Sequence, residues 1–245
     1  MPADLPSDRP AQARSKAALD RYLAQLFDRI EQQPLPDLPS VVISGALRCG
    51  KTKVSRRLAR DLGYHRLVTD EIRNDTYLNC PQGEKRRIAK YVYRRILLRF
   101  PRGVLLDGTA ALDPPRDLPP WAQARGIGFF AIGYSFDRPE DKHRDLLAYR
   151  RHQSCWTTRT LSDDDMRALA ERVIRQSHQI RAFCTAQNLR YFDLDSARFE
   201  AERNRIVTEI TAALTEKRKD APSGLMTRLA GLRQALFRAG DPPAQ

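Results

Sequence analysis

Eight consecutive residues, 45–52, constrain the fold of this chain more than any other feature, because they match the pattern G-x-x-x-x-G-K-[ST] in full. An apolar, β-branched run at 41–43 comes directly before the match, and a segment with apolar residues at helical spacing, 51–62, follows it. The motif requires this strand–loop–helix context. The sequence therefore predicts a phosphate-binding loop at the end of a buried strand.

Each fixed position of the loop has a chemical reason. Gly45 and Gly50 let backbone N–H groups converge on phosphate oxygens, which a Cβ would obstruct. Lys51 places a positive charge at the β- and γ-phosphates, and Thr52 offers a hydroxyl to Mg²⁺. We therefore expect ATP and Mg²⁺ as cofactors, bound by all eight residues: Gly45, Ala46, Leu47, Arg48, Cys49, Gly50, Lys51 and Thr52.

The rest of the central region alternates between strand and helix patterns. Strands are predicted at 41–43, 66–69, 103–106, 127–136 and 190–194. Helices are predicted at 51–62, 70–78, 84–100, 137–152, 163–187 and 197–216. Such βαβ alternation predicts a three-layer α/β fold with a five-stranded parallel sheet flanked by helices.

The pattern divides the chain into three parts. Residues 1–39 read as a leader, an amphipathic helix at 11–32 and a proline-rich linker. Residues 40–216 form the predicted catalytic domain. Residues 217–245 form a basic tail with a possible helix at 225–238, which would dock on the body, bind a partner or lie on a membrane surface.

Composition narrows the function classes. Forty-three Lys and Arg against 30 Asp and Glu give a net charge of +13, spread along the chain. This excess favours polyanionic partners, nucleic acid among them. The alternative is that the basic residues only keep the arginine-rich helices hydrated. The four cysteines are widely spaced without a C-x-x-C pair, and no signal peptide or membrane-spanning stretch is recognisable. We therefore expect a reduced, cytoplasmic protein without structural zinc.

Two carboxylates follow predicted strands. Asp70 ends the second strand and Asp107 the third. Ligands of an open parallel sheet bind beyond the carboxyl ends of its strands, so both side chains are expected at the same crevice as the loop. Asp107 is the predicted partner of Thr52 in binding Mg²⁺, and it is also expected to line the acceptor site. For either residue, the alternative is a helix cap or turn aspartate.

Residues 41–109 resemble the P-loop kinase superfamily. They are similar in particular to the branch of polynucleotide 5′-hydroxyl kinases, zeta-toxin-type kinases and chloramphenicol phosphotransferase. The residues that match are Asp70, Arg73 and Asp107-Gly108-Thr109. The resemblance implies that Asp70 orients or deprotonates the acceptor hydroxyl and that Arg73 holds an anionic part of the acceptor. Arg73 as a structural ion-pair partner is the alternative.

The same resemblance implies an arginine-bearing lid over the phosphates, for which residues 137–161 are the candidate. Arg150 and Arg159 are its predicted catalytic arginines, and an exposed basic helix face is the alternative. Arg48 and Cys49 depart from the small residues often found in kinase loops. A side chain as large as Arg48 would touch phosphates or shield the site, and Cys49 would make ATP binding sensitive to oxidation.

The favoured function is an ATP-dependent kinase that acts on a hydroxyl of a small, anionic or sugar-like acceptor. The first alternative is a polynucleotide 5′-hydroxyl kinase. The second is a nucleotide-binding switch or scaffold without transferase activity, which would engage a protein through its N-terminal helix or basic tail. The sequence has no Asn-Lys-x-Asp motif for reading guanine.

Overall fold

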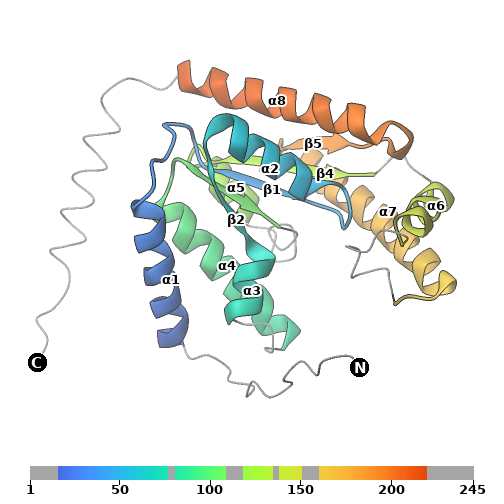
Figure 1. The fold of residues 1–245 in the computed structure, drawn as a ribbon, viewed down its shortest axis with the longest axis horizontal. Coiled ribbons are helices and arrows are strands. Elements are labelled where there is room, and N and C mark those ends of the chain that lie inside the picture. Colours follow the sequence, from blue (N-terminus) through green and yellow to red (C-terminus); the bar gives the residue numbers. More distant parts are fainter. Residues whose placement is uncertain (1–15, 77–80, 109–117, 135–137, 151–159, 220–245) are drawn as a thin grey trace, which may run out of the picture.

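The computed structural model describes residues 16–76, 81–108, 118–134, 138–150 and 160–219 (Figure 1). Its centre is a five-stranded sheet with the order β2-β3-β1-β4-β5. Every neighbouring pair of strands is parallel. The strands are β1 (Val41–Gly45), β2 (His65–Val68), β3 (Val104–Asp107), β4 (Gly128–Gly133) and β5 (Arg190–Asp193). The predicted fold class is therefore confirmed.

Helices cover both faces of the sheet. The helices are α1 (Lys16–Glu31), α2 (Lys51–Leu62), α3 (Thr69–Thr76), α4 (Gln82–Arg99), α5 (Leu118–Gln123), α6 (Pro139–Arg150), α7 (Asp163–Ala186) and α8 (Phe199–Lys219). Figure 1 shows α2 and α8 on one face, with α4 and α7 on the other. Because both faces are covered, β1, β3 and β4 are buried along their whole length.

Helix α1 packs against the outside of α4 (Figure 1). Its apolar stripe is buried, and the ring of Phe27 meets Phe100 edge-on at 5.5 Å between centroids. The Tyr91 hydroxyl donates a hydrogen bond to Asp20 across 2.5 Å. The predicted amphipathic helix therefore exists over 16–31, and residues 11–15 of its predicted range lie outside the described residues.

Three sequence predictions need correction. Strand β2 ends at Val68, so Asp70 does not end a strand but lies in the first turn of α3. The predicted fourth strand, 127–136, is observed over Gly128–Gly133; residues 127 and 134 lie outside it, and residues 135–136 lie outside the described residues. Helix α5 was not predicted, because two prolines in its six residues read as a loop; proline is nevertheless well suited to the first turn of a helix.

Some expectations fall on residues that the structure does not describe, among them the tail helix 225–238, Thr109 and Arg159. Within the described ranges, no helix is long and apolar enough to cross a membrane.

The order of the strands fixes where a ligand can bind. The chain passes from β1 to β2 on one side of the sheet and later to β4 on the other side, with β3 returning beside β1. The strand order therefore reverses at β1, and in open α/β sheets ligands bind beyond the carboxyl ends of the strands at such a point. The Gly45–Thr52 segment lies there.

Candidate nucleotide-binding site

The segment after β1 folds back tightly and then enters α2. Gly45 has a φ of 139°, and a Cβ at this position would lie 1.9 Å from the carbonyl oxygen of Ile132. The next residue, Ala46, donates its N–H to the same oxygen across 3.0 Å. Gly50 is the N-cap of α2 with a φ of 76°. Both glycines of the motif are thus favoured by the backbone angle, and Gly45 is also required by its close approach to the backbone of Ile132. The loop is a P-loop.

The side chain of Lys51 crosses the P-loop. Its ammonium donates to the carbonyl oxygen of Ala46 at 2.5 Å and lies 3.6 Å from the sulfur of Cys49, and only 8% of the residue is exposed. Phosphate oxygens are stronger acceptors than a carbonyl for an ammonium group. The position of Lys51 therefore suits a cation that is held over the loop until phosphate arrives.

The sheet side of the P-loop carries a closed ring of hydrogen bonds. Ser55 on α2 donates to the Oδ2 atom of Asp107 at 2.7 Å. Arg66 on β2 donates through Nη2 to the same carboxylate oxygen at 2.6 Å and through Nε to the Ser55 hydroxyl at 2.8 Å. The Asp107 side chain is only 3% exposed and that of Arg66 is 16% exposed. Asp107 therefore lies beside the P-loop helix, with its charge balanced by Arg66.

The opposite side of the P-loop contacts α6. The guanidinium of Arg48 stacks over the ring of Tyr149 at 5.0 Å from its centroid. The carbonyl oxygen of Arg48 accepts a hydrogen bond of 2.5 Å from the hydroxyl of Tyr134, directly after β4. The ammonium of Lys142 in turn lies 3.7 Å from the centre of the Tyr134 ring. Arg48 has a φ of 62°, which residues other than glycine rarely adopt, so these contacts hold it in an unusual conformation.

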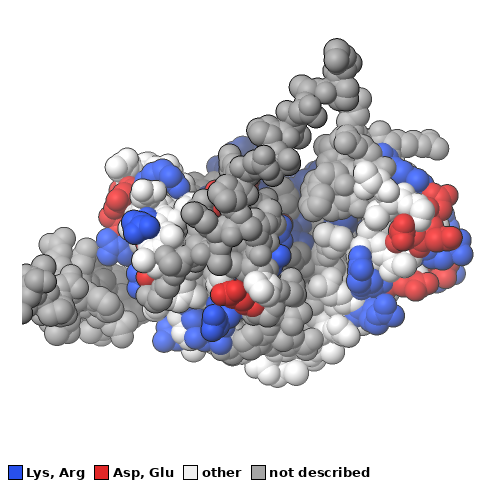
Figure 2. Space-filling view, turned by 90° about the horizontal axis from the view of Figure 1, so that it is seen from below, with Lys and Arg blue, Asp and Glu red and all other residues white. Residues whose placement is uncertain are grey.

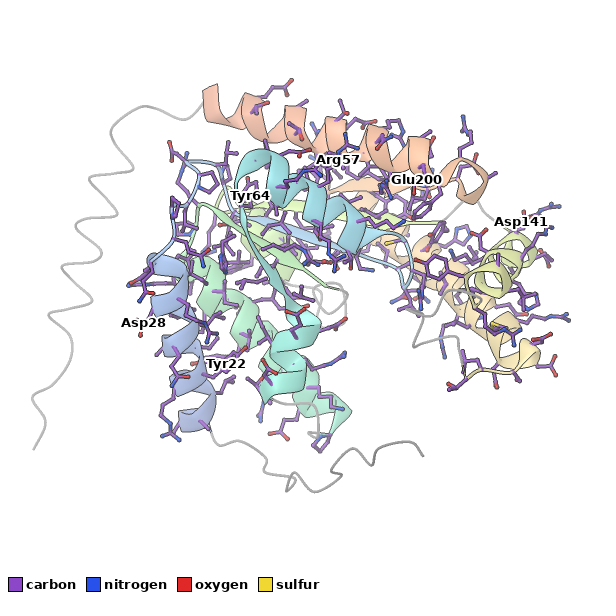
Figure 3. All side chains as sticks on the ribbon, in the orientation of Figure 1. Tyr22, Asp28, Arg57, Tyr64, Asp141 and Glu200 are labelled. Carbon is purple, nitrogen blue, oxygen red and sulfur yellow. The ribbon has the colours of Figure 1, made fainter. Side chains whose placement is uncertain are left out.

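A third element, α8, packs against the P-loop through its first residue, Phe199. A Cβ on Gly50 would come within 2.8 Å of the Phe199 ring, so this ring lies directly on the loop. Hydrogen bonds from Arg198 and Ala197 lower the pKa of Asp195, which caps the short helix leading into α8. Glu200 follows in the first turn of α8 and pairs with Lys53 at 3.6 Å (Figure 3).

Asp70 and Arg73 lie one turn apart on α3. They form an ion pair of 3.2 Å, with side chains that are 52% and 35% exposed. The residue that starts the helix, Thr69, is tied to β3 through a hydrogen bond of 3.2 Å from its hydroxyl to the Asp107 carbonyl, and the Tyr93 hydroxyl donates to Thr69 at 3.0 Å. The structure thus anchors the start of α3 and leaves the Asp70 carboxylate accessible.

The predicted lid is described only in part, over α6 and residues 160–161. Arg150 at the end of α6 forms an ion pair with Asp163, the first residue of α7, and donates to the carbonyl oxygen of Leu161 at 3.5 Å. In this structure its side chain therefore joins α6 to α7. Its catalytic role remains a prediction, as does that of Arg159.

Sequence reasoning missed several residues of the site: Ser55, Arg66, Tyr134, Lys142 and Phe199. One signal was present for Arg66, because a charged residue inside the predicted second strand needs a charged or hydrogen-bonding partner if it is buried. Tyr134 and Phe199 gave no such signal, because an aromatic residue near a strand or helix end is more often part of the core.

The residues present fit Mg²⁺ only in part. Within the described ranges, no group of three or more His, Cys, Asp or Glu side chains is arranged to hold a metal ion. Mg²⁺ does not need such a cage, because it keeps several waters and binds nucleotide phosphates. Thr52 fits, since it is exposed in the first turn of α2. Asp107 fits poorly through Oδ2, because this oxygen of the buried carboxylate already accepts two hydrogen bonds, one of them from a guanidinium.

No protein-family model matches the chain, and no curated protein matches it. Among solved structures the chain is similar to a shikimate kinase from Bacteroides thetaiotaomicron, with 16% identity over 71% of this chain and 99% of that one and a TM-score of 0.49. It is also similar to a gluconokinase from Sinorhizobium meliloti, with 16% identity over 74% of this chain and 98% of that one and a TM-score of 0.46.

A deoxyadenosine kinase from M. mycoides is similar over 71% of this chain and 99% of that one, with 11% identity and a TM-score of 0.44. All three of these proteins are kinases. Because their TM-scores lie under 0.5, the fold class rests on the sheet order and P-loop of the chain itself.

Proposed function

We propose that this protein is a kinase that transfers the γ-phosphoryl group of ATP to a hydroxyl of a small, anionic or sugar-like acceptor. The observation that carries the proposal is the P-loop at the point where the strand order reverses, with the Lys51 ammonium folded over it. A loop of this shape at a helix N-terminus presents N–H donors and a positive dipole to phosphate.

The triphosphate would lie along the P-loop, and Lys51 would exchange the Ala46 carbonyl for phosphate oxygens. Mg²⁺ bound with the nucleotide would supply positive charge that offsets the negative charge of the phosphates. Thr52 supplies the hydroxyl that would hold it. The half-buried guanidinium of Arg48 would add positive charge on the α6 side of the same loop.

The accessible carboxylate of Asp70 supports an acceptor site at the start of α3. There, the acceptor hydroxyl would give its proton to Asp70 while its oxygen bonds to the γ-phosphorus and the bond from that phosphorus to the β–γ bridging oxygen breaks, leaving ADP. Arg73 would pair with an anionic group of the acceptor, and for this reason we propose an anionic acceptor.

Nucleic acid as the acceptor receives less support. Among the described residues, Figure 2 shows Lys and Arg interspersed with Asp and Glu on the face viewed from below, without one basic block. A polynucleotide-binding groove concentrates positive charge along the path of the backbone. A small acceptor is consistent with the mixed charges of this face.

The test is transfer of label from γ-labelled ATP to a panel of sugars, nucleosides, phosphorylated metabolites and 5′-hydroxyl oligonucleotides. We expect label on one acceptor class with the wild-type protein, and a loss of about 100-fold or more in Lys51→Ala and Asp70→Ala. Arg60→Ala at the far end of α2 and Asp75→Asn on α3 are matched controls, and both should retain the rate.

Label on an oligonucleotide would replace the small-acceptor proposal with the polynucleotide one. Tight ATP binding without transfer to any member of the panel, together with full biological activity of Asp70→Ala, would favour the switch instead. Equal rates in Lys51→Ala and the wild-type protein would refute the assignment of the site.

A further inference from the structure

The carboxylate at the end of β3 occupies the position where a Mg²⁺ ligand was expected. We infer that Asp107 is instead a positioning residue, which joins Arg66 and Ser55 to fix the start of the P-loop helix and does not ligate the metal. This inference rests on the proposed nucleotide site, and it assigns the metal to Thr52 and the nucleotide phosphates.

The register of the sheet places the three residues together. Val68 pairs with Asp107, and Arg66 pairs with Leu105, two residues earlier on β3. Leu105 and Asp107 are two residues apart on β3, so their side chains point to the same face of the sheet, and Arg66 shares that face with its partner Leu105. Arg66 and Asp107 therefore both point to the face that α2 covers. Ser55 comes from α2 and is fully buried between them. Each member of the ring therefore comes from a different element.

The guanidinium of Arg66 uses two donors in two directions. Nη2 reaches the carboxylate of Asp107 at 2.6 Å and Nε reaches the Ser55 hydroxyl at 2.8 Å, while that hydroxyl donates to the carboxylate at 2.7 Å. A planar fork of this kind holds both partners at a fixed separation, which a lysine ammonium cannot reproduce. The ring therefore fixes the distance between α2 and β3.

A metal ion on the same oxygen would conflict with Arg66. Mg²⁺ binds carboxylate oxygen at about 2.1 Å. With the guanidinium nitrogen 2.6 Å from Oδ2, the two cations would lie less than about 5 Å apart in a nearly buried place, where like charges repel strongly. The Asp107 charge is thus already balanced by a protein cation.

The position of Ser55 explains why this ring matters for the nucleotide. Ser55 is one helical turn after Lys51, and its hydroxyl also lies 3.1 Å from the Thr52 carbonyl oxygen. The first turn of α2 carries the N–H groups, the ammonium and the hydroxyl that would meet the phosphates. If the ring is broken, this turn can shift relative to β1, and all of these groups lose alignment together.

The test compares ADP affinity in excess Mg²⁺ with ADP affinity in EDTA, by calorimetry on the full chain at a temperature well below unfolding. The variants are Asp107→Asn, Ser55→Ala and Arg66→Lys, with Thr52→Ala as the comparator for a metal ligand and Arg60→Ala as the surface control. We expect each ring variant to weaken ADP binding by about threefold to tenfold, equally in both buffers. Thr52→Ala should lose affinity in Mg²⁺ and little in EDTA.

Weakening of Asp107→Asn confined to the Mg²⁺ buffer would overturn the inference, because it would show that Asp107 acts on the metal. Unchanged affinity in all three folded ring variants would also overturn it, because the ring would then serve stability alone. Non-additive losses in the Ser55→Ala, Asp107→Asn double variant would support one shared unit.

A wild-type protein that binds no ADP in either buffer would refute the proposed function. Whether Ser55 and Asp107 act as one unit is then measured from the free energies of unfolding of the same single and double variants. Coupling between Ser55 and Asp107 in unfolding experiments would support the ring as a structural unit that joins α2 to β3, and additive losses would overturn it.

Discussion

The two sides of the P-loop are held by different kinds of contact. On the sheet side, Asp107 and Ser55 are buried and linked by hydrogen bonds shorter than 3 Å to each other and to Arg66. On the α6 side, Arg48 rests on Tyr149, which is 40% exposed, through a stacking contact at 5.0 Å. Buried charged hydrogen bonds are strongly directional, whereas an exposed cation–π contact is worth only about 0.5–1 kcal/mol.

The sheet side of the P-loop is therefore expected to be rigid, and the α6 side is expected to be deformable. On the sheet side, the contacts of β2 and β3 with α2 hold the first turns of that helix, which carry Lys51 and Thr52. On the other side, α6 belongs to the segment that the sequence predicts to be a lid. The weak contacts therefore lie where a closing movement is expected. The predictions below are ordered by the size of the effect that this contrast implies.

The largest effect is expected on the sheet side. Arg66→Leu leaves the Asp107 carboxylate buried without its cation, so the free energy of unfolding should fall by about 3 kcal/mol in urea denaturation. Arg60→Leu removes an arginine whose side chain is 74% exposed, and it should change stability by less than about 0.5 kcal/mol. Adding Asp107→Asn to Arg66→Leu should recover part of the loss. Similar effects of the two single changes would remove the contrast.

A middle effect is expected from Tyr134→Phe, which deletes the hydroxyl that donates to the Arg48 carbonyl in the P-loop. The free energy of unfolding should fall by about 1 kcal/mol, since a buried hydrogen bond is lost while the ring stays packed. Tyr22→Phe is the matched control, because its hydroxyl reaches Asp75 at an exposed position across 3.3 Å (Figure 3). Thermal or urea unfolding would compare the two, and an equal loss would contradict the prediction.

The smallest effect is expected from the stacked pair. A double-mutant cycle of Arg48→Ala and Tyr149→Ala should give a coupling free energy of about 0.5 kcal/mol, measured from urea unfolding. Tyr149→Phe keeps the aromatic face and should keep the coupling with Arg48. A coupling above about 2 kcal/mol would mean that the α6 side is held as firmly as the sheet side, and the comparison would fail.

Sequence patterns predicted the parts of the site that depend on neighbouring residues. The P-loop follows β1 and precedes α2 as expected, because its glycines, lysine and threonine are adjacent in the chain and act through local backbone geometry. A structural ion pair was the alternative interpretation of Arg73, and Arg73 does pair with Asp70 across one turn of α3. The prediction placed Asp70 at a strand end, yet Thr69 starts the helix one residue earlier.

The partners of Asp107 could not be predicted in this way. Arg66 and Ser55 lie 41 and 52 residues away in the sequence, and they meet the carboxylate only because β2 pairs with β3 in one particular register. The same holds for Arg150, whose ion pair with Asp163 depends on how α6 and α7 pack. A residue type at the end of a strand indicates what a side chain can do, but its neighbours decide what it does.

The sequence by itself determined the α/β fold class and the P-loop, because strand and helix periodicity and glycine geometry are local properties of the chain. The residues that would meet phosphate stay a prediction. Tertiary structure alone decided the order of the strands, the ring that joins Asp107 to Arg66 and Ser55, and the stack of Arg48 on Tyr149. These contacts join segments far apart in the chain, and they form only when buried charges and rings find partners during packing.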